Sequence, residues 1–289
     1  EDTDGDGKAD KVEKLFTGFH TDNYQARVNS LSLGLDNWIY GANGLLGGTI
    51  QPLENSLFPA DEPLNIRNRD FRFHPFRGTF ETVSGLTQQG RVRDDWGNWF
   101  GCDNSNLLFN YTLPERYIRR NPHVPVSSSV RNLTARPDGN RLFPTSPLLE
   151  RFNDPAHANR VTSAVGLEIY RDVLLGEEYY GNAFPCETVH NLVHREVLSR
   201  TLGFSSRRAS DEVQSEFLSS SDNWFRPVQA RTGPDGALYI VDMYRFLIEH
   251  PRWIPAARLA QIDVRAGADR GRIYRVVNVN KPLRPIRDL

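Results

Sequence analysis

Two stretches with one shared pattern decide the fold: Gly97-Asn-Trp-Phe-Gly-Cys-Asp103 and Gly181-Asn-Ala-Phe-Pro-Cys-Glu187. Both read G-N-x-F-x-C-[DE], and unrelated segments rarely share five such residues in register. A second pair, Gly34-Leu-Asp-Asn-Trp-Ile-Tyr40 and Gly233-Pro-Asp-Gly-Ala-Leu-Tyr239, places a tight Gly-x-Asp turn before a strand that ends in an aromatic residue. These turns lie 199 residues apart, which suits about four blades of roughly 40–50 residues each. Internal repetition of strand and turn predicts a β-propeller.

The rest of the chain supports an all-β fold, because short apolar runs end in Gly, Pro, Asn or Asp and few recur at helical spacing. We expect one β-propeller unit over residues 1–289, partial or complete, that is N-terminally truncated within its first blade. Residues 114–159, rich in Pro, Ser and Arg, are expected to be an irregular excursion between strands. The expected strands lie in residues 30–40, 71–83, 96–111, 164–174, 182–198, 227–243 and 271–277.

Composition limits the partners. The 289 residues carry a net charge of -1, so charge gives no reason to expect nucleic acid as a partner. No run approaches the roughly 20 apolar residues of a membrane helix, so no membrane span is expected. The chain begins at Glu1 rather than Met, which we interpret as a mature, trimmed or fragmentary sequence.

Residues 1–13 have the ligand spacing of a calcium loop. Oxygen ligands fall at loop positions one, three, five, seven, nine and twelve, with Gly7 at six where such a loop turns sharply. The ligands in that order are Asp2, Asp4, Asp6, the Lys8 carbonyl, Asp10 and Glu13. No helices flank the loop, and residues 11–17 read as a strand, so a bound calcium would act as a structural clip. The alternative is a solvated acidic turn.

Two histidines and two cysteines are candidates for metal binding, catalysis or a disulfide bond. His190 and His194 have helical zinc spacing, but their valine-rich surroundings favour a strand, on which they would lie about 13 Å apart, too far for one metal. His190 is either a hydrogen-bonding residue at a strand end or a catalytic base. Cys102 and Cys186 hold matching repeat positions, so they form either a disulfide or two buried small side chains.

Arginines and an acid gather near the fourth repeat. Arg226 and Arg231 precede Asp242, and arginines with carboxylates near a strand end hold an anionic cofactor or form a salt-bridge network between blades. The first interpretation makes Arg231 and Asp242 cofactor-binding residues and Arg226 a holder of cofactor or substrate oxygens. Both interpretations remain open here.

Five segments carry a family resemblance: GLDNWIYGANG, DDWGNWFGCDNSN, GNAFPCETVHNLVHR, DNWFRPVQARTGPDGALYIVDMYR and DRGRIYRV. They resemble the propeller domain of the membrane-bound dehydrogenases of planctomycete-type bacteria, which often continues into HEAT-like repeats and a cytochrome c domain. At longer range the GxDGxLY turn is similar to that of soluble quinoprotein glucose and sorbosone dehydrogenases. The resemblance implies export to the periplasm or the extracellular space, and it makes pyrroloquinoline quinone a family-level expectation.

Two departures limit what is carried over. The chain has no CxxCH haem motif, so a cytochrome c domain is a candidate partner only in a longer protein. The stretch before Gly34 offers no histidine at the place of the family's base, and His20 lies further upstream.

The residues and the resemblance together predict an exported sugar- or alcohol-dehydrogenase-like propeller that acts on a carbohydrate or small alcohol. Export, the dehydrogenase-like activity, its substrate class and quinone dependence are what the family resemblance implies. His190 would be its base and Arg226 would hold substrate oxygens. The alternative is a non-catalytic propeller that binds a glycan or a partner protein through aromatics such as Trp38, Trp99 and Trp224.

Overall fold

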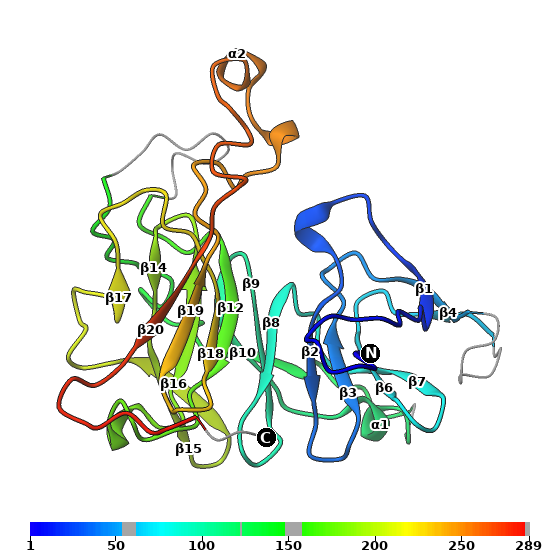
Figure 1. Cartoon of the computed structure of the whole chain (residues 1–289). Helices are drawn as coiled ribbons and strands as arrows, with labels where there is room; N and C mark the ends of the chain where they lie inside the picture. The colour runs from blue at the N-terminus through cyan, green and yellow to red at the C-terminus, as the bar shows by residue number, and fades with distance from the viewer. Residues whose placement is uncertain (54–61, 122, 148–157, 287–289) are drawn as a thin grey trace.

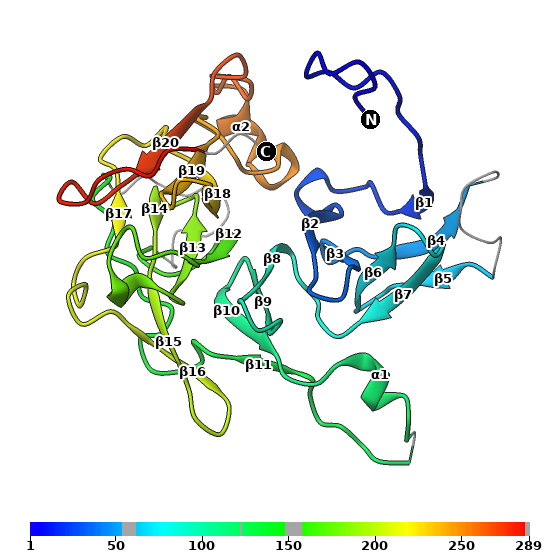
Figure 2. The ribbon, with the colours of Figure 1, turned by 60° about the horizontal axis from the view of Figure 1, so that its bottom comes forward.

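The computed structural model describes residues 1–53, 62–121, 123–147 and 158–286. Their strands form antiparallel sheets that radiate as four blades, with one further sheet beside the first blade (Figures 1 and 2). The further sheet has the order β1-β4-β5, with β1 at Phe16–Phe19, β4 at Gly48–Pro52 and β5 at Leu64–Asn65. The first blade has the order β2-β3-β6-β7, with β2 at Asn29–Leu33, β3 at Ile39–Ala42, β6 at Asp70–His74 and β7 at Thr79–Val83.

The second blade contains β8 at Gln89–Arg93, β9 at Trp99–Asp103, β10 at Asn106–Tyr111 and β11 at Val130–Asn132. The third contains β12 at Ala164–Ile169, β13 at Ala183–Glu187, β14 at Leu192–Val193, β15 at Glu196–Arg200, β16 at Phe204–Arg208 and β17 at Leu218–Ser219. The fourth contains β18 at Pro227–Thr232, β19 at Leu238–Asp242 and β20 at Arg272–Val276.

In the part of the chain that the structure describes, helices are few and short. The α-helices are α1 at Glu115–Ile118 and α2 at Ala256–Leu259. The 3-10 turns are η1 at Tyr24–Ala26, η3 at Glu177–Tyr179 and η4 at Pro251–Trp253. Among the described residues no helix has the length and apolar character that a membrane crossing requires.

The first strand of each blade lies toward the middle of the fan (Figure 2). Strand β8 contacts both β2 and β12, and β12 in turn contacts β18. Radial sheets whose first strands line a common centre define a β-propeller. The prediction of an all-β propeller is therefore confirmed.

A bulge recurs in these inner strands, where the register shifts after Asn29, Gln89, Val165 and Pro227. Two of the bulges carry a glycine with positive φ, Gly90 (φ 89) and Gly166 (φ 59). A side chain on Gly90 would lie 2.5 Å from the backbone nitrogen of Leu167, and one on Gly166 would overlap the Val228 carbonyl. Glycine at these bulges allows each inner strand to approach the next blade closely.

The repeats occupy equivalent strands. The G-N-x-F-x-C-[DE] segments form β9 and β13, each the second strand of its blade. The Gly-x-Asp turns join β2 to β3 and β18 to β19, so they belong to the first and fourth blades. The 199 residues between them therefore span three blade steps rather than four, because the 114–159 segment lengthens one step.

The structure differs from the sequence prediction in two segments. Residues 114–159 are not wholly irregular, since they contain α1 and also β11, which pairs with β10 as the outer strand of its blade. Residues 11–15 are not a strand, because β1 begins only at Phe16. Residues 11–14 are all exposed, so they have no apolar face packed on the protein, and burial begins only at Leu15.

Apolar cores join most of the blades. One core joins the second and third blades through residues such as Phe100 and Leu167, and another joins the third and fourth through Phe184 and Ile240. A third core, around Phe71, packs the first blade on the sheet β1-β4-β5. Between the first and second blades lies instead a buried ion pair, Arg91 with Asp70. This interface differs from the others in being polar and aromatic.

Candidate functional site

His190 is a buried residue whose ring is engaged on both sides. Its Nε2 accepts a hydrogen bond from the backbone N–H of Asn159 at 3.1 Å, so the neutral ring carries its proton on Nδ1. Nδ1 then donates to the Glu187 carboxylate at 2.8 Å. Both ring nitrogens are thus bonded to protein groups, and this geometry favours the hydrogen-bonding interpretation over a catalytic base.

Arg226 is buried, and among the described residues its side chain binds backbone carbonyls. Its guanidinium donates to Thr188 at 3.0 Å and Arg245 at 2.9 Å, and also to the Phe246 carbonyl. Burial lowers the pKa of Arg226, and nearby carboxylates offset part of that effect. Its donors already have acceptors, so Arg226 links the Thr188 loop of the third blade to the loop that follows β19. The structure does not place it where it holds substrate oxygens.

Asp242 and Arg231 lie apart at the two ends of the fourth blade. The buried Asp242 accepts hydrogen bonds from the backbone N–H groups of Arg226 and Tyr244, each at 2.8 Å, and from the side chain of Arg272. Arg231 pairs with Glu168 at 3.1 Å, which joins β18 to β12. This geometry matches the salt-bridge alternative rather than a shared cofactor site.

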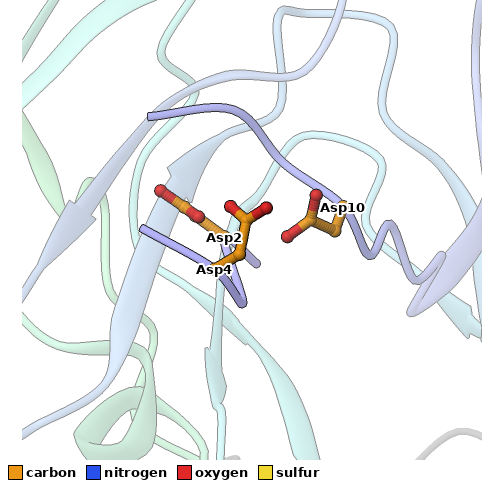
Figure 3. Close-up of side chains that lie close together, drawn as sticks. All are labelled: Asp2, Asp4 and Asp10. Atoms are coloured by element: carbon orange, nitrogen blue, oxygen red, sulfur yellow. The ribbon is translucent and has the colours of Figure 1, made fainter. Parts of the chain in front are cut away.

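The N-terminal loop brings three carboxylates together. Oxygen atoms of Asp2, Asp4 and Asp10 all lie within 4.8 Å of one another, and Figure 3 shows them converging. Hydrogen bonds from the Gly5 and Gly7 amides lower the pKa of Asp2. The turn around these carboxylates is therefore ordered by the backbone.

The two other predicted carboxylate ligands, Asp6 and Glu13, do not join this group. Asp6 bonds the Lys8 amide at 2.8 Å and pairs with the Lys8 ammonium at 3.5 Å. Glu13 is exposed and lies outside the group that the described residues form. Three of the predicted ligands thus converge, while the carboxylates of Asp6 and Glu13 lie outside the group.

The two cysteines are free and fully buried. Cys102 belongs to the core between the second and third blades, and Cys186 to the core between the third and fourth. Burial raises the pKa of both thiols. Of the two alternatives, the structure matches two buried small side chains and not a disulfide, because each thiol packs into its own core.

A pocket of about 680 Å³ lies where the inner strands begin. We call it the central pocket. Its walls include Gln89 at the start of β8, Val165 at the start of β12 and Val228 in β18. Residues just before β2 and the loop after β19 complete it. The lining polar residues are Asn23, Tyr24, Gln25, Gln88, Gln89, Asn104, Ser105, Thr162, Ser163, Thr188, Glu249 and His250.

Two adjacent residues supply complementary chemistry in the central pocket. His250 Nδ1 accepts a hydrogen bond from the Arg252 amide at 3.2 Å, so the neutral ring carries its proton on Nε2 as a donor. Tyr24 stacks on this imidazole, with ring centroids 4.5 Å apart. Glu249 contributes the one carboxylate among the pocket's described lining residues. Consecutive residues of this loop therefore bring a proton donor, His250, and a proton acceptor, Glu249, to the lining of the pocket.

Free polar groups complete the pocket. Within the described chain, the side chains of Asn104 and Ser105 are exposed and make no hydrogen bond to other protein groups. Gln25 donates to the Ile248 carbonyl at 2.7 Å, which ties the η1 segment to the loop carrying Glu249. The lining therefore presents uncharged hydrogen-bonding groups to a ligand.

Sequence reasoning missed Glu249 and His250. The only local signal is Glu-His-Pro, in which His250 caps the short turn η4. That pattern is common in loops. Glu249 and His250 can be recognised as pocket residues only once the fold brings Gln88 and Asn104, from distant parts of the chain, into the same lining.

Three comparisons place the chain among known proteins. A family model described as a domain of unknown function (DUF7133) matches residues 1–280. A search of curated proteins finds no match. A solved structure from Thermus thermophilus, titled as an oxidoreductase (glucose dehydrogenase), is similar over 75% of this chain and 77% of that chain, at 16% identity and a TM-score of 0.34. A likeness at that TM-score carries no argument about this chain.

Proposed function

Because the chain belongs to the DUF7133 family of domains of unknown function, we propose its function from the central pocket: it binds a sugar or small alcohol there. The observation that carries this proposal is the lining, which combines uncharged amides and hydroxyls with a single carboxylate. Hydroxyl groups of a sugar both donate and accept, so they match such a mixed lining.

In the bound state His250 Nε2–H would donate to a substrate oxygen, while Glu249 would accept a hydroxyl proton. The stacked Tyr24 ring holds the imidazole in place. Glu249 therefore replaces His190 as the candidate base of a dehydrogenase-like reaction, in which an external two-electron acceptor would take the hydride.

Pyrroloquinoline quinone does not fit the residues of this pocket. The cofactor carries three carboxylates, and burying anions requires cationic partners. The described lining contains no Lys or Arg, and Glu249 would add repulsion. We therefore derive no step through this quinone.

A calcium ion held by Asp2, Asp4 and Asp10 is proposed as a structural clip at the N-terminus, since hard cations prefer carboxylate oxygens. We further propose that the protein works outside the cytoplasm, in the periplasm or the extracellular space. The segments that resemble exported dehydrogenase propellers support this location.

Calorimetric titration with a panel of neutral sugars and polyols tests the proposal. We expect at least one to bind, with affinity reduced about tenfold in Glu249→Gln and in Asn104→Ala, since each loses a hydrogen bond worth about 1.4 kcal/mol. The exposed Asp269→Asn is the matched control and should bind like the wild type. If no compound binds, or the variants bind unchanged, the central pocket is not the site.

Dye reduction with an added soluble quinone separates the two versions of the function. Turnover that Glu249→Gln abolishes would support a dehydrogenase. Binding without turnover would support the non-catalytic alternative, a propeller that only holds its glycan.

A further inference from the structure

A second pocket, of about 490 Å³, lies between the first and second blades. We call it the interblade pocket. Its lining includes the turns that follow β2 and β8, at Leu35 and Gly97, so it opens at the opposite end of the inner strands from the central pocket. The α1 segment closes one side with Glu115, Arg116 and Arg119.

Aromatic rings form a large part of this lining. Tyr40 and Trp99 pack with ring centroids 4.1 Å apart, and Tyr111 lies behind them. The buried Arg91 guanidinium stacks on Tyr111 at 4.6 Å and on Trp99 at 5.0 Å, which fixes the rings in place. Trp96 stands at the rim and is 67% exposed. The flat faces offer a surface on which a ring-shaped ligand can lie.

Charges in the interblade pocket are paired, with one exception. Arg72 binds Asp36 at 2.9 Å and also pairs with Glu81. Arg69 and Arg119 both bind Glu115 at 3.1 Å.

Arg116 is the exception, since it pairs with no acid in the described chain. Its guanidinium only stacks on Tyr117, at 5.1 Å. The lining therefore leaves one exposed guanidinium for an anionic group.

The carboxylates also limit the ligand. The side chains of Asp36 and Glu81 are each 42% exposed, so they accept hydrogen bonds from hydroxyl groups while bound to Arg72. A phosphate carries more negative charge than the single guanidinium of Arg116 balances, and these acids would repel the excess. A sugar ring with several hydroxyls and a single carboxylate would match both groups, its hydroxyls donating to Asp36 and Glu81 and its carboxylate pairing with Arg116.

We propose that the interblade pocket is a glycan-binding site that takes a uronic acid residue. The sugar ring lies on Trp99 and Trp96, its hydroxyls donate to Asp36 and Glu81, and its carboxylate pairs with Arg116. This site is separate from the central pocket and does not depend on the function proposed for it.

Calorimetric titration with trigalacturonate, against uncharged galactotriose, tests the proposal. Trigalacturonate should bind and galactotriose should bind at least tenfold more weakly. We expect Arg116→Gln and Trp96→Ala each to weaken trigalacturonate binding about tenfold or more. Because both residues are exposed, neither change should lower the Tm.

Arg120→Gln is the matched control, because Arg120 is an exposed neighbour outside the lining. It should bind trigalacturonate like the wild type, as should Glu249→Gln in the central pocket. The proposal is overturned if trigalacturonate does not bind, or if Arg120→Gln loses as much affinity as Arg116→Gln. It is also overturned if the Glu249→Gln protein, whose central pocket is weakened, binds galactotriose as tightly as trigalacturonate. Binding of a neutral sugar that Glu249→Gln weakens, and that Arg116→Gln and Trp96→Ala do not, would support the central pocket. It would not count for or against the interblade pocket.

Discussion

His190 and Asn106 make the same contact in neighbouring blades. His190 Nδ1 lies 2.8 Å from Glu187, three residues earlier, and Asn106 donates to Asp103, also three residues earlier, at 2.8 Å. In both pairs the acid is the last residue of the G-N-x-F-x-C-[DE] motif, and its partner lies three residues after it. The imidazole and the amide therefore serve one structural purpose, closing the turn after the second strand of a blade.

This equivalence predicts that His190→Asn keeps the fold. Asparagine can donate to Glu187 but loses the bond to the Asn159 amide, so we expect about 1–2 kcal/mol of destabilisation. Urea unfolding would measure it, and sugar binding at the central pocket should not change. A His190→Asn protein that is fully stable but has lost ligand turnover would restore His190 as a catalytic residue.

A second prediction concerns pH and the buried His194. Its Nδ1 lies 2.6 Å from Glu216 and its Nε2 3.0 Å from Glu196. Burial alone lowers the pKa of His194, but the two carboxylates raise it by more, so the pKa lies above its usual value. Burial likewise opposes ionisation of Glu196, yet the His194 and Arg136 hydrogen bonds hold its pKa at about 2.

The signs of these shifts define a stability window. The raised pKa of His194 contributes stability below its unfolded pKa of about 6.5, and this is lost as pH rises through the folded value. The depressed pKa of Glu196 contributes stability above about pH 4.3, and this is lost as pH falls toward 2. Urea midpoints should therefore be highest between these limits.

His194→Gln should remove the alkaline decline and lower stability by roughly 1–3 kcal/mol, because Glu196 and Glu216 lose the buried cation they share. Each carboxylate keeps one arginine, Arg136 and Arg208 respectively. The exposed His123→Gln is the matched control and should keep the wild-type pH profile. A wild-type protein whose midpoint does not fall as pH rises from 6 to 9 would contradict a charged His194.

A third prediction tests the inner-strand bulges. Gly166 has φ 59, and an added Cβ would overlap the Val228 carbonyl of the next blade. Gly181 has φ 74 but no atom within 4 Å of such a Cβ. Both alanine variants carry the cost of a left-handed backbone, about 1–2 kcal/mol, whereas only Gly166→Ala also displaces a strand.

Urea unfolding should therefore show Gly166→Ala to be clearly less stable than Gly181→Ala. Equal losses would mean that the inner strands of the third and fourth blades are not held in close contact.

A fourth prediction concerns the N-terminal loop. If calcium binds Asp2, Asp4 and Asp10, chelation by EDTA should lower the Tm by a few degrees, because a ligand that binds only the folded state stabilises it. Asp4→Ala should have the lower Tm already and should no longer respond to EDTA, while Asp269→Ala should respond like the wild type. A metal-loaded protein whose Tm is unaffected by EDTA would show that the loop is a solvated acidic turn.

The sequence by itself determined the local features of this protein. In each Gly-x-Asp turn the aspartate accepts a hydrogen bond from the tyrosine four residues later, Tyr40 to Asp36 and Tyr239 to Asp235. The partners in such a turn are near neighbours in the chain, so local residue order specifies the contact. The strands, the repeats and therefore the propeller could be predicted for the same reason.

Only the tertiary structure showed which residues come together in the two pockets. The central pocket joins Gln88 and Asn104 to Glu249, and the interblade pocket joins Asp36 to Arg116. Loops that are far apart in sequence meet only because the blades stack around a common centre, and no local pattern records which loops become neighbours. The same packing buried His190 and Arg226. Their burial could not be predicted from sequence, because a polar residue near a repeated motif can close a turn or line a cavity, and the position of the neighbouring blade decides between the two.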